Sequence, residues 1–508
     1  MLSANTYDFA NAFAVFDFSY EKFTSAYDKI VNRKYVIKNN DRNIKFDDLI
    51  TISIVEHEYF HGRHFNSSSI GYLLFSLKQR ITINKNELLK LLPFPDWLEN
   101  VNSNNDLLDF MKKAPLKCRS HLIDITHDSI ILDSLNKFSK KNLQVFHGLQ
   151  KTLNGQWAII GAGNKNRDYL LKNILPPDFS LFSLYKKSAS MKEIAEGLAI
   201  WKEYSYISRL LWHNYRDIFS DYTRKWLETS YGQSTYRKAV DLIYRATGCN
   251  MSMALTGVLL DIALSGPCYS LRTRKWDEVH PSLRLARVLT IAEKIPNHLK
   301  SPDNIDMVDI DYYLEIEKFI CNHFGWTQKN INLDETLNAI KTRISFTQEN
   351  ISTPPNSIDL LATAYEPRFI YGLSAERDYP STQLSPWNHE YREFIGHYTK
   401  PAISIFSNKI IASAPLDEHP IILITYLNDI VVTLVVNAIL NNHLMPFTSQ
   451  SSFKRARTIY NQRKTAFDPE VWDSLQKNYN INYEDFISDK IGFDYREFTK
   501  LGNSLSIY

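Results

Sequence analysis

The feature that most constrains the fold is a series of long segments in which apolar residues recur at helical spacing. A helix with this pattern buries one face against its neighbours. Glycine, which weakens helices, contributes only 16 of the 508 residues. We therefore predict a mainly α fold with minor β. The segments with the clearest helical pattern are 188–212, 310–324, 333–349, 421–442, 451–465 and 468–478.

Three short segments are the candidate strands. They are rich in β-branched and aromatic residues and cover 34–38, 143–147 and 156–160. The dipeptide Asn154-Gly155 favours a tight turn just before the last of them. We therefore expect a hairpin from the second and third segments.

The charge balance argues against two classes of partner. The chain has 59 Lys and Arg against 56 Asp and Glu, and a net charge of +3 is too small to indicate binding to nucleic acid or to an anionic membrane. The most apolar runs, 251–266 and 420–440, contain Asp261 and Asp429. An ionised carboxylate is costly inside a bilayer. We therefore expect buried helices in these runs, and no membrane span.

Cysteine use and the N-terminal sequence favour a reducing, cytoplasmic location. The first 23 residues contain Asp8 and Asp17 and lack the basic region of a signal peptide. A zinc ribbon or CxxC pair needs closely spaced cysteines, and the four in this chain are scattered. They are Cys118, Cys249, Cys268 and Cys321.

The clearest chemical signal is HEYFH at 57–61. On a helix, His57 and His61 lie one turn apart on one face, where both imidazoles can ligate one metal ion. Asp47 is a plausible N-cap for such a helix. Imidazole nitrogens suit Zn²⁺, and Glu58 is placed to act as general base toward water at the metal. The alternative is a chance pairing of two core histidines.

A third histidine follows in the same predicted helix. His64 lies seven residues beyond His57, which is about 10 Å along a helix axis. Ligand nitrogens must reach zinc at about 2 Å. We therefore expect His64 to support the site, face a substrate or serve the structure, rather than bind the metal.

The predicted helix at 188–212 supplies the candidate third ligand. Ser190 and Glu193 have the S-x-x-E spacing of a capping box, which gives Glu193 a structural role. Glu196 follows among apolar neighbours, and a buried carboxylate is costly unless it is paired, protonated or metal-bound. Gly197 favours close approach of another helix or backbone. A salt-bridged helix glutamate is the alternative for Glu196.

HEYFH followed at a distance by Glu-Gly-Leu-Ala at 196–199 resembles the gluzincin type of zinc metallopeptidase, within the broad peptidase-MA-like group. The resemblance implies that His57, His61 and Glu196 hold Zn²⁺. It also implies that Glu58 is the general base. It covers two helices rather than the whole chain.

The break at Pro302, with every metal-site signature before it, predicts a division of the chain near residue 300. An α+β zincin-like catalytic core would occupy 1–295 and carry an insertion around 90–185, and a helical accessory domain would occupy 296–508. The insertion accounts for a gap between the histidines and Glu196 that is long for the group. Ile200 stands where thermolysin-like members have a second acid.

Peptide hydrolysis builds negative charge on the carbonyl oxygen, which a donor opposite the metal stabilises. The sequence at 279–287 resembles the HPxxxxR element of some HExxH peptidases, with different arginine spacing, and makes His280 the candidate donor. The alternative is a helix start with Pro281 near its first position. Weaker candidates are Tyr204, Tyr206 and His213.

These features predict a zinc-dependent metallopeptidase that acts on a protein or peptide substrate. One alternative is a non-catalytic helical interaction protein on the same scaffold. Another is a metal-dependent hydrolase of a non-peptide substrate. The sequence indicates neither the cleavage specificity nor the oligomeric state. Because a peptidase among its own cell's proteins needs restraint, we expect 290–508 to act as a gatekeeper.

Overall fold

Helices dominate the part of the chain that the structure describes, which confirms the predicted mainly α fold with minor β. The computed structural model describes 6–8, 13–30, 45–91, 180–214, 220–225, 234–248, 253–267, 276–300, 310–349, 357–378, 403–407 and 410–412, with scattered positions between 121 and 135. Several predicted elements lie outside the described residues. These are the strands at 34–38, 143–147 and 156–160 and the helices at 421–442, 451–465 and 468–478.

The chain divides into two compact units, each made of separate stretches of sequence. The first comprises 1–74, 133–350 and 365–414, and the second comprises 75–132, 351–364 and 415–508. This division differs from the one expected at 295/296. Residues from beyond 296 belong to the same unit as the predicted metal helices, and Lys329 and Asp261 form a buried ion pair across the expected boundary.

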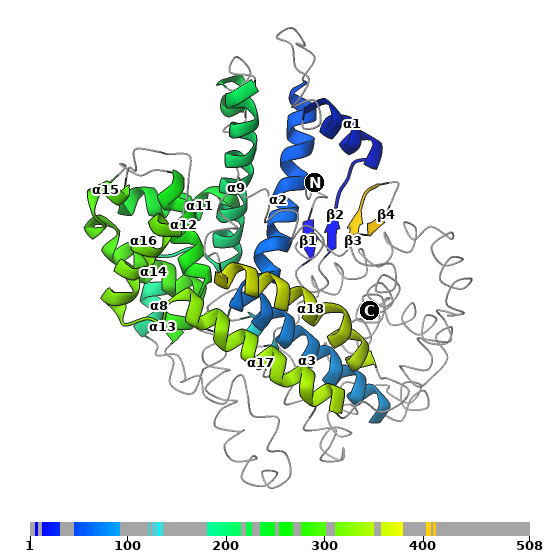
Figure 1. Ribbon diagram of the computed structural model, residues 1–508. Coiled ribbons are helices and arrows are strands. Elements are labelled where there is room, and N and C mark those ends of the chain that lie inside the picture. Colours follow the sequence, from blue (N-terminus) through cyan, green and yellow to red (C-terminus); the bar gives the residue numbers. More distant parts are fainter. Residues whose placement is uncertain are drawn as a thin grey trace, which may run out of the picture. The chain divides into compact units, whose positions relative to one another are not determined.

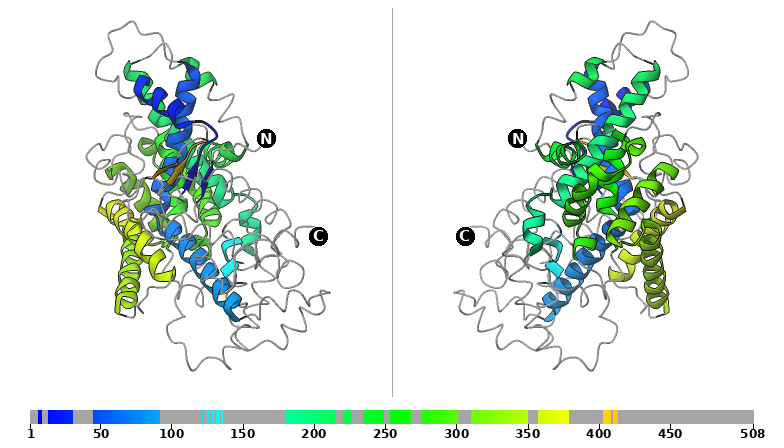
Figure 2. Two further views of the ribbon diagram at one scale, coloured as in Figure 1. Left: turned by 90° about the vertical axis from the view of Figure 1, so that its right-hand side faces the viewer. Right: turned by 90° about the vertical axis from the view of Figure 1, so that its left-hand side faces the viewer.

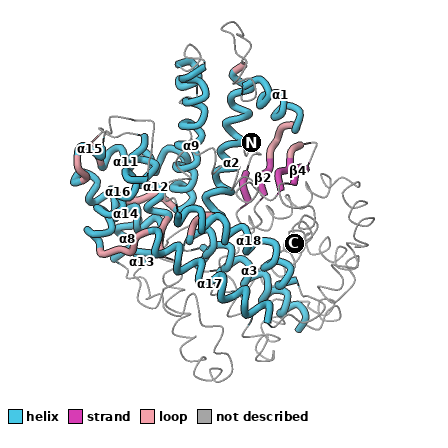
Figure 3. Tube along the Cα trace, viewed as in Figure 1, coloured by secondary structure: helices cyan, strands magenta, loops and turns pink. Residues whose placement is uncertain are grey.

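A small mixed sheet of three-residue strands belongs to the first unit (Figure 3). The outer pairs of strands are antiparallel and the central pair is parallel, with Ala14 opposite Ser404. The sheet thus joins the N-terminal region to a segment almost 400 residues later. In order across the sheet, the strands are β1 (Thr6–Asp8), β2 (Phe13–Val15), β3 (Ile403–Ile405) and β4 (Ile410–Ala412).

The predicted metal helices α2 (Phe46–Asn66) and α9 (Met191–Asn214) lie side by side at the centre of the first unit (Figures 1 and 2). On its other side α2 packs against β1, β2 and α1 (Tyr20–Ile30). On its other side α9 packs against α11 (Ser234–Ala246) and α12 (Met253–Leu264). Both helices are therefore enclosed, which explains why α2 is buried on most of its circumference.

The two central helices begin differently. The capping box predicted for α9 is present: the Ser190 backbone N–H donates to Glu193 Oε2 at 2.7 Å, and the Glu193 N–H donates to Ser190 Oγ at 3.2 Å. The N-cap of α2 is Lys45 rather than the predicted Asp47, and no side chain caps it. Asp47 instead lies in the first turn, where a carboxylate interacts favourably with the helix dipole.

Glycines allow two of these helices to approach α9 closely. A Cβ on Gly257 of α12 would lie 2.9 Å from the Trp201 ring of α9. Gly197 of α9 faces α11, where a Cβ would lie 3.4 Å from the Ala239 Cβ. The close neighbour expected at Gly197 is therefore α11 rather than the metal helix.

Within the apolar run 251–266, Met253–Leu264 form α12, which is buried from Ala254 to Leu264. Among the helices that the structure describes, none has both the length and the apolar character needed to cross a membrane. The second apolar run, 420–440, lies outside the described residues.

The junction between the end of α2 and the start of α3 packs against helices from the later part of the chain. Gly372 lies so close to the Asn66 backbone that a Cβ would be 2.4 Å from its carbonyl oxygen, and the Thr336 hydroxyl donates to Ser69 Oγ at 3.0 Å. The other helices whose bounds the structure describes are α3 (Ser69–Leu91), α8 (Ser180–Tyr185), α13 (Trp276–Val279), α14 (Pro281–Ile291), the 3₁₀ helix η3 (Ala292–Lys294), α15 (Asn297–Lys300), α16 (Ile310–Phe324), α17 (Lys329–Glu349) and α18 (Ser357–Asp378).

Candidate metal centre

The structure brings together the three residues predicted as metal ligands. His57 Nε2 lies 3.0 Å from Glu196 Oε2, and His61 Nε2 lies 3.2 Å from the same oxygen. The two Nε2 atoms are 3.2 Å apart. These atoms form a nearly equilateral triangle, and the two rings, whose planes are 82° apart, both direct Nε2 toward it.

The triangle fits one face of a zinc coordination tetrahedron. Ligand atoms about 2.0–2.1 Å from a tetrahedral zinc ion are about 3.3 Å from one another, close to the separations between these three atoms. Two imidazoles and one carboxylate suit zinc chemically. Three protein ligands that leave one position open are typical of catalytic zinc sites, whereas structural sites use four. The residues present therefore fit a zinc ion.

Glu58 lies next to the first ligand in sequence and interacts electrostatically with His57, Glu196 and Glu203. Its side chain is buried, and none of the residues that the structure describes hydrogen-bonds its carboxylate. Burial, assisted by Glu196 and Glu203, raises the pKa of Glu58 to about 7 despite the opposing effect of His57. A carboxyl group with this pKa can accept and release a proton near neutral pH.

A carboxylate that sequence reasoning missed binds the other nitrogen of His57. Glu203 Oε2 lies 3.2 Å from His57 Nδ1, and the Ser53 hydroxyl donates to Glu203 Oε1. Ile200, where the thermolysin-like pattern has its acid, is buried in an apolar cluster instead. Glu203 lies two turns beyond Glu196 on α9, so a search for a carboxylate at seven rather than four residues would have found it.

The charges of the three predicted ligands are coupled. Burial acts to raise the pKa of Glu196, but the nearby His61 and His57 outweigh it and hold that pKa well below its usual range. Burial lowers the pKa of His61. Burial also acts to lower the pKa of His57, but hydrogen bonds to Glu196 and Glu203 outweigh it and raise that pKa. Glu196 is therefore ionised and His61 neutral, as metal binding requires, while His57 must lose a proton.

Tyr236 is a second residue of the site that sequence reasoning missed. It comes from α11, and its ring meets the His57 ring edge-on with centroids 5.6 Å apart. Burial raises its pKa, with further contributions from Glu196 and Glu58. The side chain is partly exposed, and no described residue hydrogen-bonds its hydroxyl. No spacing in the sequence relates it to the HEYFH motif.

The structure gives His280 a different place from the one predicted. Its ring is fully buried between Tyr185 and Trp276, and its Nδ1 accepts from the Ser282 backbone N–H as the N-cap of α14. Pro281 occupies the first turn, as the alternative interpretation expected. A ring without exposed surface cannot contact a substrate carbonyl, so we withdraw His280 as the donor.

The weaker candidates gain no support from their surroundings. The Tyr204 hydroxyl lies 3.5 Å from Thr223 Oγ1, and Tyr206 belongs to the apolar core. The side chain of His213 lies outside the described residues.

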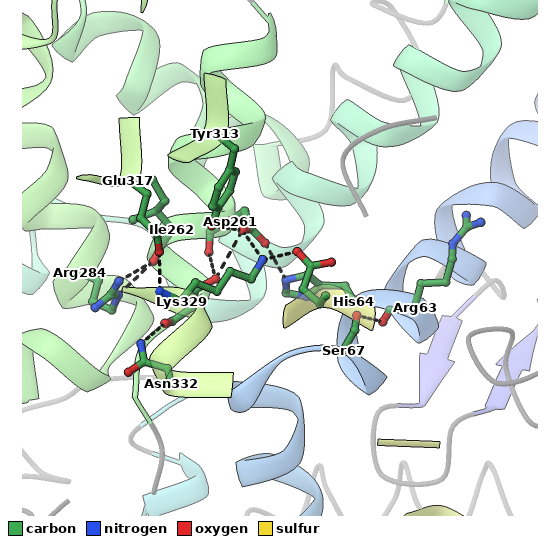
Figure 4. A network of polar contacts seen from close by, with 12 residues as sticks. Arg63, His64, Ser67, Asp261, Ile262, Arg284, Tyr313, Glu317, Lys329 and Asn332 are labelled. Atoms are coloured by element: carbon green, nitrogen blue, oxygen red, sulfur yellow. Dashed lines mark hydrogen bonds and ion pairs between the residues drawn. The ribbon is translucent and has the colours of Figure 1, made fainter. Parts of the chain in front are cut away.

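His64 lies outside the ligand triangle, in agreement with the prediction from the helix rise. It belongs instead to a second polar cluster. Its Nε2 lies 3.5 Å from Asp261 Oδ1. Lys329 Nζ lies 2.7 Å from Asp261 Oδ2 and 2.6 Å from Glu376 Oε1, and the Tyr313 hydroxyl donates to Asp261 at 2.7 Å. Figure 4 shows His64, Asp261, Tyr313 and Lys329 converging from α2, α12, α16 and α17, and Glu376 joins them from α18. We call these five residues the lysine cluster.

Comparison with known proteins gives no relative for this chain: no family model, curated protein or solved structure matches it. The chemistry of the site therefore rests on its own geometry.

Proposed function

We propose that this protein is a zinc-dependent metallopeptidase whose ion is held by His57, His61 and Glu196. The observation that carries the proposal is the triangle of two Nε2 atoms and one carboxylate oxygen, with Glu58 buried beside it and free of described hydrogen bonds. A chance pairing of two core histidines would not explain why one carboxylate oxygen of Glu196 lies within 3.2 Å of both Nε2 atoms. The zincin-like core and the gluzincin relationship remain part of this proposal.

In this proposal the side chains divide the work of peptide hydrolysis. Zinc, when bound, acidifies water and polarises a carbonyl group. Glu58 would take the proton from the attacking water and pass it to the leaving amine, and burial raises the pKa of this carboxyl group to about 7 in the metal-free fold. The hydroxyl of Tyr236, a residue that is partly exposed, replaces His280 as the donor to the carbonyl oxygen. The scarcity of cysteine supports a cytoplasmic location for this activity.

Metal analysis and a matched pair of variants test the proposal. We expect the purified protein and Glu58→Gln to hold one zinc per chain, and His57→Ala to hold none. A peptide-library digest read by mass spectrometry should show cleavage by the parent protein. Cleavage by Glu58→Gln should be slower by about 100-fold or more.

Three results would count against it. A parent protein that takes up no zinc on reconstitution would remove the metal site, and leave the interaction protein as the better hypothesis. Equal cleavage by Glu58→Gln would exclude the proposed base. Stoichiometric zinc with no cleaved peptide would favour the hydrolase of a non-peptide substrate.

A further inference from the structure

We infer that Glu203, Ser53 and Tyr222 form a buried hydrogen-bond relay that fixes the ring of His57 for metal binding. The three are positioning residues, since none of them belongs to the ligand triangle. This inference rests on the proposed zinc site and extends it to the side chains that hold one of its ligands.

The relay begins at the nitrogen of His57 that faces away from the triangle. Glu203 Oε2 lies 3.2 Å from Nδ1, whereas Nε2 points to Glu196. A carboxylate only accepts hydrogen bonds, so Nδ1 carries the proton and donates it to Glu203. In the neutral ring Nε2 is then left with its lone pair, which is the form that binds a metal ion.

The directions of the remaining hydrogen bonds follow from the number of protons. The Ser53 hydroxyl donates to Glu203 Oε1, and it has only one proton to give. Tyr222 Oη lies 3.0 Å from Ser53 Oγ, so the tyrosine must donate to the serine. The chain of donors thus runs from Tyr222 through Ser53 to Glu203, where it meets the proton of His57.

The relay is sealed from solvent. Tyr222 has no exposed surface, and Ser53 and Glu203 are 1% and 4% exposed. Tyr222 packs in an apolar cluster with Leu49 and Ile207. Hydrogen bonds in such surroundings are stronger than in water, and buried donors without partners are costly, so each member holds the next in place.

The relay makes two contributions to zinc binding. It selects the Nε2 lone pair and the ring orientation of His57, and the negative charge of Glu203 makes that nitrogen a better donor to a cation. Loss of a carboxylate partner of a ligating histidine typically weakens metal binding about 10–100-fold. We expect a loss in this range for Glu203→Gln, and a smaller loss, about threefold to tenfold, for Tyr222→Phe, which acts through Ser53.

Tyr313→Phe provides the matched control. Tyr313 is also fully buried and also donates its hydroxyl to a buried acceptor, but that acceptor is Asp261 in the lysine cluster. Tyr222→Phe and Tyr313→Phe thus remove the same group from two fully buried positions. Both should lower the thermal stability of the metal-free protein, and only Tyr222→Phe should weaken zinc binding.

The experiment uses the full-length chain. Zinc affinity is measured by competition with a chelator of known affinity, and Co²⁺ is used as a spectroscopic probe of the ligand field. We expect the visible Co²⁺ spectrum to shift in Glu203→Gln and Tyr222→Phe but not in Tyr313→Phe. Folding of each variant is checked by circular dichroism.

The outcomes separate the relay from the zinc site itself. A parent protein that binds neither metal would overturn the proposed site and the relay with it. A parent that binds zinc, with Tyr222→Phe and Glu203→Gln within twofold of its affinity, would overturn the relay alone. If Glu203→Gln fails to fold, Tyr222→Phe still decides, because an unchanged affinity and Co²⁺ spectrum in that variant contradict the inference.

Discussion

Helix α2 contributes to two buried polar clusters that obtain positive charge in different ways. In the lysine cluster, Asp261 and Glu376 both contact the ammonium group of Lys329. In the candidate metal centre, the described partners of Glu196 are imidazoles, which become ligands when they are neutral. A buried carboxylate needs a compensating charge in either case. A lysine supplies that charge permanently, whereas neutral imidazoles allow it to be supplied by a metal ion that binds and dissociates.

The pKa values of the two clusters express the same difference. Burial acts to lower the pKa of Lys329, but Asp261 and Glu376 outweigh it and raise that pKa. Burial acts to raise the pKa of Asp261, but Lys329 and His64 outweigh it and lower that pKa. This pair stays ionised at every physiological pH. Glu58, by contrast, titrates near pH 7, so the charge of the metal centre changes in the physiological range.

The largest effect should follow from removing 296–508. This deletion takes away Lys329 and Glu376, leaves Asp261 buried without its cation, and removes β3 and β4 from the sheet. We expect the truncated chain to lose cooperative unfolding and zinc binding, measured by circular dichroism and chelator competition. A folded, zinc-binding product would show that the lysine cluster is dispensable. Deletion of 290–508 would therefore report on folding, and the gatekeeper role remains a prediction.

Lys329→Met removes the positive charge of the lysine cluster and keeps a side chain of similar volume. Two buried carboxylates lose the ammonium group that both contact, so we expect unfolding in urea to require about 3–5 kcal/mol less free energy. Lys238→Met, which breaks the more exposed pair with Glu193, should cost about 1 kcal/mol or less. Equal losses in the two variants would contradict the contrast between buried and exposed pairs.

Tyr236→Phe tests how a hydroxyl group without a described hydrogen-bond partner differs from one that has such a partner. The Tyr313 hydroxyl is committed to Asp261, whereas that of Tyr236 has no described partner and is partly exposed. We expect kcat for a cleaved peptide to fall about 10- to 100-fold, with zinc affinity unchanged. An unaltered kcat would remove Tyr236 as the donor, and a parallel loss of zinc would make its role structural.

The contrast between the clusters also concerns pH. His57 and Glu58 have raised pKa values in the metal-free fold, so the stability that their protonated forms contribute is present below their ordinary values of 6.5 and 4.5 and is lost as pH rises through the folded-state values. We expect the metal-free protein to become less stable between pH 5 and pH 8, measured by urea unfolding. Zinc displaces the His57 proton, so its affinity should rise with pH by up to about tenfold per unit. A zinc affinity independent of pH would contradict a protonated His57.

Acid should destabilise both clusters through their ionised carboxylates. Asp261 and Glu196 both have lowered pKa values, so their contributions to stability are present above their ordinary values of 3.8 and 4.5 and are lost as the pH falls below them. Asp261→Asn should therefore flatten only the part of the acid-unfolding profile that belongs to the lysine cluster.

Local sequence was sufficient to predict side-chain contacts within one or two turns of a helix. The i, i+4 spacing of His57 and His61 places both rings on one face whatever surrounds them, and Ser190 and Glu193 cap α9 through local hydrogen bonds. The helical spacing of apolar residues likewise fixed α16 at 310–324, as predicted.

Contacts between side chains far apart in the sequence depend on the tertiary structure and could not be predicted from local patterns. Glu203 reaches His57 across 146 residues, and Lys329 reaches Asp261 across 68, because the packing of whole helices sets these contacts. Burial of His280 likewise depends on the helices around it, since the same His-Pro sequence at an exposed helix start would leave the ring free. Local spacing specifies which face of a helix a residue occupies, and the packing of other helices determines what that face touches.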